Sequence, residues 1–596
     1  MLKQALAHHQ AGHIDQAELA YKEILRLSPE NPDALHFLGL IAYQNQDYDI
    51  ATKLIMKAIG INPNNPIFLR HLGQTFQKQN KLDQAINSYQ QAIKINPKYT
   101  EAYNNLGELF HLKNKLDQAI NLFQKSISLN SNVASTHYIL GNLLGEKGEP
   151  SRAFKAYQKA IVLNPKHAEA HCKIGDIYQE QGNLDQAINS YHMALDSCPN
   201  LAEGHNNLGS VLKKKNQLDA AIVAFEKAIE TNPKHVRAHS NLGATLVEKN
   251  KLEEATQHFE KALSLNPNFA DAHFNQAIIL LLQGRLKAGW EKYEWRWDSI
   301  QKSQKRDFKQ LLWDGTSLKS KTILVHTEQG FGDAIQFVRY VDFLCDLNTT
   351  VIVECEAELK TLFKSIGRID KLMTKGEKIH SFDVHVPLLS LPHIFGTTLK
   401  NIPAKTPYLY PDTKTNSILL SNNNHKFKIG IAWAGNPEHI NDHNRSVDLK
   451  QFGCLLDTGD CEFFSLQVGE HSKDIKQCGY YHIIKNLGKQ FTNFHHTASA
   501  ILQLDLVISV DTAVAHLAGA LGKPVWTLLP FIPDWRWMLN RSDSPWYPCY
   551  DTLSPKEERR LAQRFPRNPT YTYTVFSAIG VKFQHSFKCY ANFNPY

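Results

Sequence analysis

Small residues recur with a fixed period of 34 residues through the first half of this chain. One column of the period consists of Ala5, Gly39, Gly73, Gly107, Gly141, Gly175, Gly209, Gly243 and Ala277. A column of alanines follows 12 residues later, from Ala17 to Ala255, and a column of prolines, broken only by Ser131, follows 24 residues after the first. A period of this length is typical of stacked supersecondary units. It predicts helical hairpins, because small residues let two helices approach closely and proline ends the second helix.

The repeats resemble the tetratricopeptide repeat in period and in every column except the aromatic at its start, where this chain mostly has alanine or histidine. We expect residues 1–298 to form eight repeats and a degenerate ninth, stacked into an all-α right-handed superhelix with a concave groove. One position of the first helices should project into that groove and carries Asn105, Asn207, Asn241 and Asn275. Two interpretations remain open: a solvated polar face, or amides that hold an extended peptide, as a similar asparagine ladder does in the protein O-GlcNAc transferases. Phe37, His71, Ile139 and Lys173 interrupt the ladder.

Short apolar runs alternate with amphipathic segments after a polar connector at 299–320. We expect buried strands at Thr322–Val325, Val351–Glu354, Ile429–Trp433, Phe463–Gln467, Leu506–Val510 and Val525–Leu529. This alternation predicts doubly wound parallel sheets in two Rossmann-like halves, at 321–416 and 429–553, joined by an asparagine-rich linker at 417–428. Ligands in such folds bind at the carboxyl ends of the strands, so the chemistry should lie just after strands.

The first predicted strand runs into a glycine-containing turn and an acidic helix start. Gly330 and Gly332 permit the tight turn, whereas Ile335 takes the third glycine position of a dinucleotide fingerprint and disfavours a nicotinamide or flavin site. Asp333 opens the following helix. It either stabilises the helix dipole or acts as a general base, and only geometry decides between these roles.

The second predicted half carries charged residues after two of its strands. Arg445 is a fixed cation that suits a diphosphate. His439 and His443 stand four residues apart in an irregular segment, which favours a polar loop over a metal site. Asp511 and Thr512 are suited to cap a helix of small residues that begins at Ala513, where a phosphate could bind. His516 on that helix is either a core histidine or a group that reaches the phosphate.

The segment from Trp290 to about Leu553 resembles bacterial tetratricopeptide-repeat glycosyltransferases whose catalytic half is similar to the heptosyltransferase family, with its two-Rossmann GT-B architecture. The resemblance rests on blocks in the same order, namely WEKYEWRW, LLWDG, EQGFGDAIQFVRY, VPLLSLPHIFGTTL, IGIAWAGNP, NRSVDL, FFSLQVG and SVDTAVAHLAGALGKPVW. It implies that Asp333 is the base of an inverting, metal-independent transfer. It also implies a donor site that includes Gly330, Gly332, Arg445, Asp511, Thr512, Ala513 and His516.

Two function classes follow from these patterns. The first is a glycosyltransferase that moves a sugar from a nucleotide donor, needing no further cofactor, to a protein held in the repeat groove; a glycan or lipid-linked acceptor is a variant that the repeats disfavour. The alternative is a repeat scaffold with an inactive transferase-like domain. It is favoured by the atypical basic tail at 554–596, which lacks a helical period.

The composition limits the possible binding partners and the cellular compartment of the protein. No apolar run approaches the roughly 18 residues that a membrane span needs. The tail has seven basic and two acidic residues, so it supplies more than half of the net charge of +8, and the near-neutral remainder argues against nucleic acid. Nine cysteines without a CxxC pair indicate reduced thiols. With no signal-peptide pattern at the N-terminus, we expect a cytoplasmic protein.

Overall fold

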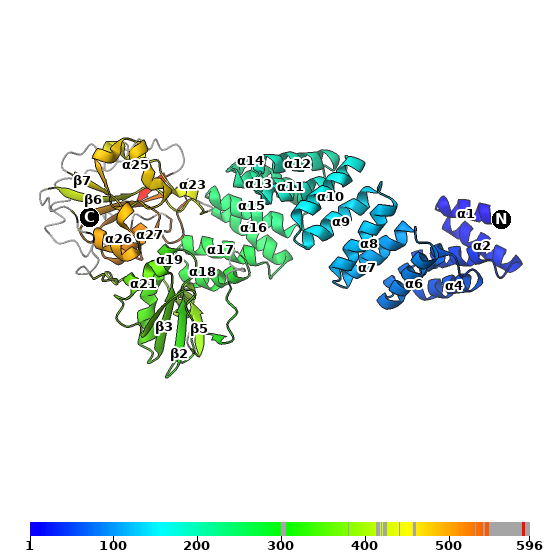
Figure 1. Ribbon diagram of the computed structural model, residues 1–596, viewed down its shortest axis with the longest axis horizontal. Helices are drawn as coiled ribbons and strands as arrows, with labels where there is room; N and C mark the ends of the chain where they lie inside the picture. The colour runs from blue at the N-terminus through cyan, green and yellow to red at the C-terminus, as the bar shows by residue number, and fades with distance from the viewer. Residues whose placement is uncertain are drawn as a thin grey trace. The chain divides into compact units, whose positions relative to one another are not determined.

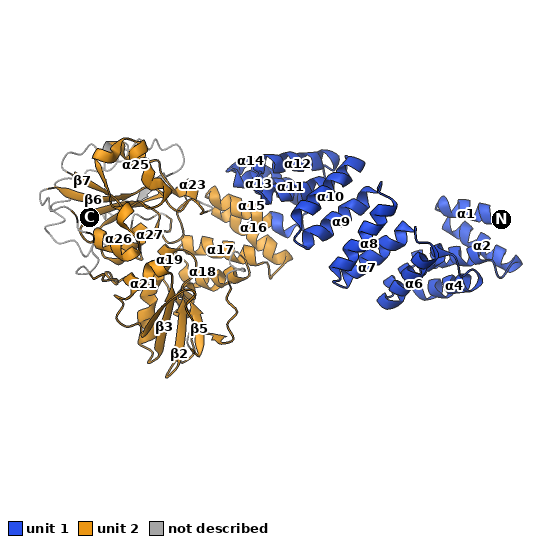
Figure 2. Ribbon diagram, in the orientation of Figure 1, with its two compact units in different colours: residues 1–238 blue, residues 239–596 orange. Residues whose placement is uncertain are grey.

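A computed structural model describes residues 1–299, 305–379, 381–412, 418, 420, 426–439, 442–456, 461–530, 532–539, 541, 543–547 and 587–590. The chain forms two compact units, Met1–Ala238 and His239–Tyr596 (Figures 1 and 2). Most of the predicted linker at 417–428 and of the basic tail at 554–596 lies outside the described residues.

Residues 1–299 are all-α, as the period predicts, and their helices pair into nine hairpins (Figure 1). The first unit holds α1 (Leu2–Gln10), α2 (Ile14–Leu27), α3 (Pro32–Gln44), α4 (Tyr48–Ile61), α5 (Pro66–Lys78), α6 (Leu82–Ile95), α7 (Thr100–Leu112), α8 (Leu116–Leu129), α9 (Ala134–Glu146), α10 (Pro150–Leu163), α11 (Ala168–Glu180), α12 (Leu184–Ser197), α13 (Ala202–Lys214) and α14 (Leu218–Thr231). Helix α15 (Val236–Glu248) spans the boundary between the units. The second unit continues with α16 (Leu252–Leu265), α17 (Ala270–Leu282) and α18 (Leu286–Tyr293). Among the described residues, no helix is long and apolar enough to cross a bilayer.

The glycine column makes room for a side chain of the partner helix. A Cβ on Gly209 would lie 2.7 Å from Cε1 of Phe225, and one on Gly73 would lie 2.5 Å from Cε1 of Tyr89. Six of the seven glycines face an aromatic ring in this way, and Gly39 faces Ile55. The prediction that the small residues lie where the two helices of a hairpin touch is therefore confirmed.

A second column, which the sequence analysis missed, sets the turn within each hairpin. One residue per repeat has a positive φ, between 54° and 80°, and these residues are Gly12, Gln46, Asn80, Asn114, Gly148, Gly182, Asn216, Asn250 and Gly284. Glycine and asparagine adopt this left-handed conformation most readily, which explains the composition of the column. Because the column extends to Gly284, the last hairpin turns in the same way as the first.

The second unit contains two sheets of mostly parallel strands, as predicted. The first has the order β1-β5-β2-β3-β4 and is entirely parallel, with β1 (Leu311–Leu312), β2 (Thr322–His326), β3 (Thr350–Cys355), β4 (Lys371–Thr374) and β5 (Val384–Pro387). The second has the order β11-β10-β9-β6-β7-β8, with β6 (Phe427–Ala432), β7 (Cys461–Ser465), β8 (Ile484–Asn486), β9 (Leu506–Val510), β10 (Val525–Pro530) and β11 (Phe587–Tyr590). Among these strands only β11 is antiparallel to its neighbour.

Helices connect the strands, and the last repeat hairpin shares their core. The connecting helices are α19 (Phe331–Phe337), α20 (Val341–Cys345), α21 (Ala357–Phe363), α22 (Leu391–Ile394), α23 (Asp442–Arg445), α24 (Gly453–Leu456), α25 (Asp474–Gln477), α26 (Phe494–Ile501) and α27 (Ala513–Ala520). Trp290 of α18 is fully buried, and its ring centroid lies 5.1 Å from that of Trp535 and 5.7 Å from that of Phe337. The compact unit therefore includes the last hairpin together with both sheets, although the repeat pattern runs to residue 298.

A buried arginine joins the end of the repeats to the first sheet. Arg296 lies in the 3₁₀ helix η1 (Glu294–Trp297) and its side chain is fully buried. It donates from Nη2 to Oε1 of Glu328 at 2.9 Å and from Nη1 to Oε1 of Glu294 at 2.7 Å. Nη2 also donates to Oγ of Ser390 at 2.8 Å. Burial raises the pKa of Glu328, and Arg296 opposes that shift. This network satisfies the hydrogen bonds that a buried ion pair requires.

We predict that Gly209→Ala destabilises the repeat array by about 1–3 kcal/mol, because the new methyl group would force the ring of Phe225 to move. Urea unfolding followed by circular dichroism measures the change. Gly60→Ala is the matched control, since a Cβ there meets nothing within 4 Å and alanine favours a helix. Equal midpoints for the two variants would contradict the prediction.

We predict that Glu328→Gln lowers the stability of the second unit by about 3 kcal/mol, because it leaves the buried charge of Arg296 with a weaker partner. Thermal unfolding is the measurement. Glu470→Gln breaks the exposed pair of Lys473 and Glu470 in the same unit and should change the melting temperature little. A melting temperature of Glu328→Gln within error of the control would show that the pair is not structurally important.

Candidate functional site

Two helix starts, one from each sheet, meet at the carboxyl ends of their strands. Helix α19 follows β2, and α27 follows β9. A Cβ on Gly332 would lie 2.9 Å from Cδ2 of His516 and 3.6 Å from Cα of Ala513. Glycine at 332 therefore lets the start of α19 approach the start of α27. Gly330 and Gly332, which the sequence places in a tight turn, lie where the two sheets come together.

Asp333 takes part in both the helix start and a charged cluster. Its Oδ2 accepts a hydrogen bond from the backbone N–H of Gly330, the N-cap residue of α19, at 3.0 Å. Its Oδ1 accepts one from Nη2 of Arg536. Burial raises the pKa of Asp333, while Arg536 and the Gly330 amide act in the opposite direction. The carboxyl group is thus mostly buried, with 15% of its side chain exposed, and is held in a fixed orientation.

Arg536, which the sequence analysis missed, is the central cation of this cluster. Only 8% of its surface is exposed, and it donates from Nη1 to Oδ1 of Asp534 at 2.6 Å as well as to Asp333. The guanidinium lies 4.1 Å from the ring centroid of Trp535. Burial acts to lower its pKa, but Asp333 and Asp534 raise it further, so the group stays charged. Its Nε is buried and has no partner among the described residues. The segment Asp534–Trp537 lies shortly after β10, which ends at Pro530, so its position after a strand was the one sequence signal for it.

Asp511 and His516 lie next to this cluster. Burial, followed by the charge of Asp534, raises the pKa of Asp511 to about 6, and Arg536 opposes the shift. His516 is 4% exposed; its Nε2 lies 3.7 Å from Oδ1 of Asp511 and its Nδ1 lies 3.0 Å from the hydroxyl of Tyr547. Burial and the charge of Arg536 lower the pKa of His516 well below its usual value. The imidazole is therefore a neutral, packed group with one nitrogen facing Asp511.

The start of α27 differs in one respect from the prediction. Thr512 occupies the N-cap position, but no side chain caps the helix. The Thr512 hydroxyl instead lies 3.2 Å from Oγ of Ser509, at the end of β9. The amides of Ala513 and Val514 donate to no acceptor among the described residues. The first amides of a helix have no intrahelical partner and favour anions.

Arg445 ends the short helix α23, in the segment that follows β6. The backbone N–H of Gly435 donates to Oγ of Ser446 at 2.9 Å, and that hydroxyl donates to Oδ1 of Asp442 at 2.8 Å. Nε of Arg445 donates to the same oxygen of Asp442 at 3.3 Å. Arg445 is among the charges that lower the pKa of Asp511 and of His439. The positive charge of Arg445 therefore acts on Asp511. The side chain of His443 lies outside the described residues.

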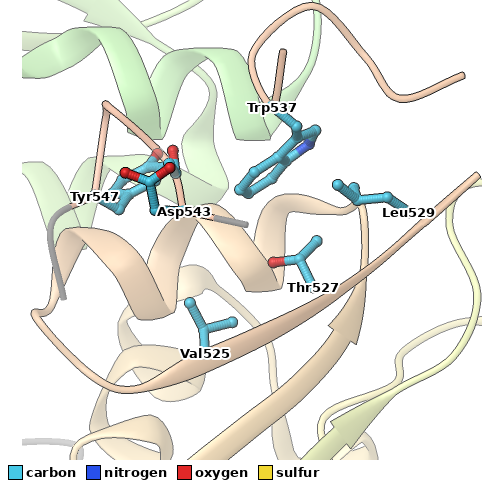
Figure 3. Close-up of a pocket in the computed structure, with 7 residues that line it drawn as sticks. Val525, Thr527, Leu529, Trp537, Asp543 and Tyr547 are labelled. Carbon is cyan, nitrogen blue, oxygen red and sulfur yellow. The ribbon is translucent and has the colours of Figure 1, made fainter. Parts of the chain in front are cut away.

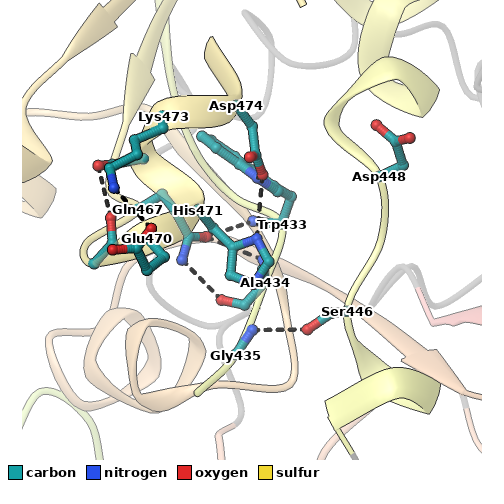
Figure 4. A network of polar contacts seen from close by, with 12 residues as sticks. Trp433, Ala434, Gly435, Ser446, Asp448, Gln467, Glu470, His471, Lys473 and Asp474 are labelled. Carbon is teal, nitrogen blue, oxygen red and sulfur yellow. Dashed lines mark hydrogen bonds and ion pairs between the residues drawn. The ribbon is translucent and has the colours of Figure 1, made fainter. Parts of the chain in front are cut away.

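A glutamine fixes the strand ends that precede this loop (Figure 4). Oε1 of Gln467 accepts hydrogen bonds from the backbone N–H groups of Trp433 at 3.1 Å and Ala434 at 3.0 Å, and its Nε2 donates to the Ala434 carbonyl at 3.0 Å. The indole N–H of Trp433 donates to Oδ2 of Asp474 at 2.9 Å, and His471 shares that oxygen. The carboxyl ends of β6 and β7 are therefore tied together independently of any ligand.

A small cavity lies between β10 and the segment that follows it (Figure 3). It is lined by Val525, Thr527, Leu529, Trp537, Asp543, Ser544 and Tyr547. Its volume of about 10 Å³ has room for one water. The carboxylate of Asp543 is paired with Arg541 at 2.7 Å. This cavity is too small for a nucleotide or a sugar.

The four asparagines of the predicted groove lie half-buried on the first helices α7, α13, α15 and α17. Asn207 already has partners, since it donates to Oδ1 of Asp176 at 2.9 Å and accepts from Nδ2 of Asn206 at 3.1 Å. The Oδ1 of Asn105 is buried without a hydrogen bond among the described residues. In the second unit, Asn241 and Asn275 occupy the same repeat position. The side-chain amide of Asn207 is therefore hydrogen-bonded within the array, whereas the Oδ1 of Asn105 has no donor among the described residues.

Family profiles match the repeats. A profile described as TPR repeat matches residues 77–113, 141–182 and 175–216. Three profiles described as Tetratricopeptide repeat match residues 202–235 and 236–269, residues 258–291 and residues 100–133. The profile of Anaphase-promoting complex, cyclosome, subunit 3 matches residues 10–92.

Individual proteins are similar to parts of the chain. Protein FlbA of Caulobacter vibrioides is 22% identical over 298 residues, which are 44% of this chain and 49% of FlbA, so the chain spans about half the length of that relative. YrrB, described as a TPR protein with an unusual peptide-binding site, is 25% identical with a TM-score of 0.28. The matched region is 31% of this chain and 95% of the YrrB chain. MamA is 28% identical with a TM-score of 0.27 and covers 28% of this chain and 92% of its own. The Cut9–Hcn1 hetero-tetramer of the APC/C is 18% identical with a TM-score of 0.35, covering 45% of this chain and 52% of its own. From the profile matches and the helical hairpins, the first 290 or so residues are tetratricopeptide repeats.

Proposed function

We propose that the chain is an inverting glycosyltransferase of GT-B type, which transfers a sugar from a nucleotide donor to a protein that the repeats bind. The observation that carries the proposal is the convergence of Asp333, Arg445, Asp511 and Arg536 from the ends of four strands. These strands belong to two parallel sheets, and ligands of such sheets bind at their carboxyl ends. The helices α19 and α27, one from each sheet, begin next to each other. This arrangement suits a ligand that has a charged centre and a different group at each end.

The donor diphosphate fits the positive groups of the second sheet. Its charge would be met by the guanidinium of Arg445 and by the amides of Ala513 and Val514 at the start of α27. The unpartnered Nε of Arg536 offers a further donor at the side of Asp333. In the transfer, the bond between the anomeric carbon and the diphosphate oxygen breaks. These fixed donors stabilise the charge that develops on the leaving group.

Asp333 is suited to the role of general base. Its carboxylate is buried, and burial raises the pKa of the group, which makes it a stronger base than an exposed aspartate. Each carboxylate oxygen has two lone pairs, so an acceptor hydroxyl has a place to bind beside the hydrogen bonds from Gly330 and Arg536. Asp333 would take the hydroxyl proton while the oxygen attacks the anomeric carbon from the face opposite the diphosphate, which inverts the configuration.

The second candidate is a protein-binding scaffold in which the α/β part is inactive. It is favoured by the family profiles, all of which match within the repeats. In both candidates the repeats hold a protein. The two candidates differ in whether the second unit binds a nucleotide sugar.

We predict that Asp333→Asn reduces transfer by about 100-fold or more while donor binding persists, because only the proton acceptor is lost. Donor binding is measured by thermal shift with uridine, adenosine and guanosine diphosphates and their sugars; a ligand at 100 times its Kd adds about 2.7 kcal/mol. Turnover is measured as release of the nucleoside diphosphate. Asp534→Asn is the control, because it removes the other carboxylate that binds Arg536 but keeps the carboxylate of Asp333.

Two outcomes would decide against parts of the proposal. If Asp333→Asn turns over at the wild-type rate, Asp333 is not the base. If no nucleotide shifts the melting temperature of the wild-type protein, the scaffold is the better description. A nucleotide that stabilises the wild type but not Arg445→Ala would identify the donor and the diphosphate contact together.

We predict that Asp511→Asn stabilises the second unit above pH 6 and leaves it unchanged near pH 4. The folded-state pKa of Asp511, about 6, exceeds the usual value of about 4, so its contribution to stability is complete at low pH and is lost as the pH rises through 6. Thermal unfolding as a function of pH measures this. Asp543→Asn should show the opposite sign, because Arg541 lowers the pKa of Asp543. An identical pH profile of wild type and Asp511→Asn would contradict the assignment.

A further inference from the structure

A groove runs along the outer side of the fourth and fifth hairpins, within the first unit. It lies between α8 and α10, the second helices of those hairpins, with α9 at its base (Figure 1). Its volume is about 370 Å³, and it is lined by Gln124, Ile127, His137, Leu140, Leu144, Arg152, Lys155, Ala156 and Lys159. All of these residues lie in the described part of the chain. The rim of the groove is formed by second helices, whereas the asparagines of the predicted peptide site lie on first helices.

The neighbouring repeats explain why space is left here. The position of Leu144 holds Phe110 in the preceding repeat and Tyr178 in the following one. The position of Ala156 holds Leu122 in the preceding repeat and Ser190 in the following one. Relative to the preceding repeat, two larger side chains are thus replaced by smaller ones. The floor that results is apolar, with Leu140 and Leu144 at 8% and 2% exposure.

The rim of the groove is more basic in this repeat than in the two neighbouring repeats. Arg152, Lys155 and Lys159 project from the exposed face of α10. The same positions hold Gln118, Asn121 and Lys125 in the preceding repeat and Gln186, Asn189 and Met193 in the following one. Arg152 pairs with Glu149, which does not line the groove. Lys155 and Lys159 have no carboxylate partner among the residues that the structure describes, and no acidic residue lines the groove.

We propose that this groove binds a short acidic segment of a partner protein, whose apolar side chains enter the floor and whose carboxylates pair with the basic rim. Charge complementarity favours this occupant, because an apolar cleft beside two unpaired ammonium groups and a guanidinium selects peptides that combine aliphatic or aromatic side chains with Asp or Glu. The site is independent of the transferase proposed above. It would give the repeats a second contact surface. The rim of this surface is formed by second helices, whereas the asparagines of the predicted peptide site lie on first helices.

Selection from a phage-displayed library of random peptides tests the proposal on the full chain. The wild-type protein should enrich peptides that are rich in Asp, Glu and large apolar residues. The charge variant combines Arg152→Gln, Lys155→Asn and Lys159→Met, which are the residues of the following repeat and are therefore compatible with the fold. A fluorescein-labelled copy of the most enriched peptide is then measured by fluorescence anisotropy. Its affinity should fall by about ten-fold or more in the charge variant, since three exposed ion pairs are lost, and should weaken with added salt.

Two further variants separate the groove from general charge effects. Leu144→Tyr, which takes the side chain of the following repeat, fills the floor and should also weaken the peptide. Lys227→Met removes the lysine at the repeat position of Lys159 in α14, away from the groove, and should leave the affinity unchanged. Circular dichroism of each variant establishes that the helices remain folded.

Three results would overturn the proposal. The first is selection of peptides with no acidic enrichment. The second is equal affinity of the enriched peptide for the wild type and the charge variant. The third is self-association of the wild-type protein in sedimentation that the charge variant abolishes, which would assign the groove to a second copy of the chain.

Discussion

The buried pair of Arg296 and Glu328 fixes the part of the structure on which the candidate site depends. A guanidinium without access to water must find protein acceptors, and here they come from η1, from the turn after β2 and from Ser390 beyond β5. Glu328 stands two residues before Gly330, whose backbone N–H donates to Asp333. The end of the repeat array thus determines where the turn after β2 lies, and through it the position of the proposed base.

The site itself keeps several carboxyl groups close together in a buried place. Asp534 raises the pKa of both Asp333 and Asp511, and Arg536 offsets part of this repulsion. Such an arrangement is unfavourable for stability, and side chains with perturbed pKa values concentrate at functional sites. The neighbouring His516 does not add to the charge, because burial keeps it neutral. The cluster therefore places fixed charges beside uncharged aromatic and imidazole groups. In such a low-dielectric place, a small change in the charge of a ligand has a large effect on its interaction energy.

Much of the fold follows from periodicity, and much of the site does not. The 34-residue columns and the six apolar runs correctly predicted the hairpins and the main parallel strands. The left-handed turn residues obey the same period and were detectable in the same way. Arg536 was harder to find, since it lies in a segment without periodicity and its partner Asp333 is 203 residues away in sequence. The side-chain cap expected from Thr512 is absent because its hydroxyl lies against Ser509, a contact that no local pattern encodes.

The burial of Trp290 has a consequence for how such a chain can evolve. Each of the earlier hairpins contacts its neighbours, so a copy gained or lost among them changes the length of the array without disturbing the α/β sheets. The final hairpin differs, because Trp290 packs on Trp535 and Phe337 and Arg296 follows directly behind it. Any repeat that came to occupy this place by duplication would have to bring those side chains with it. The number of repeats is free to drift, while the identity of the last one is tied to the sheets.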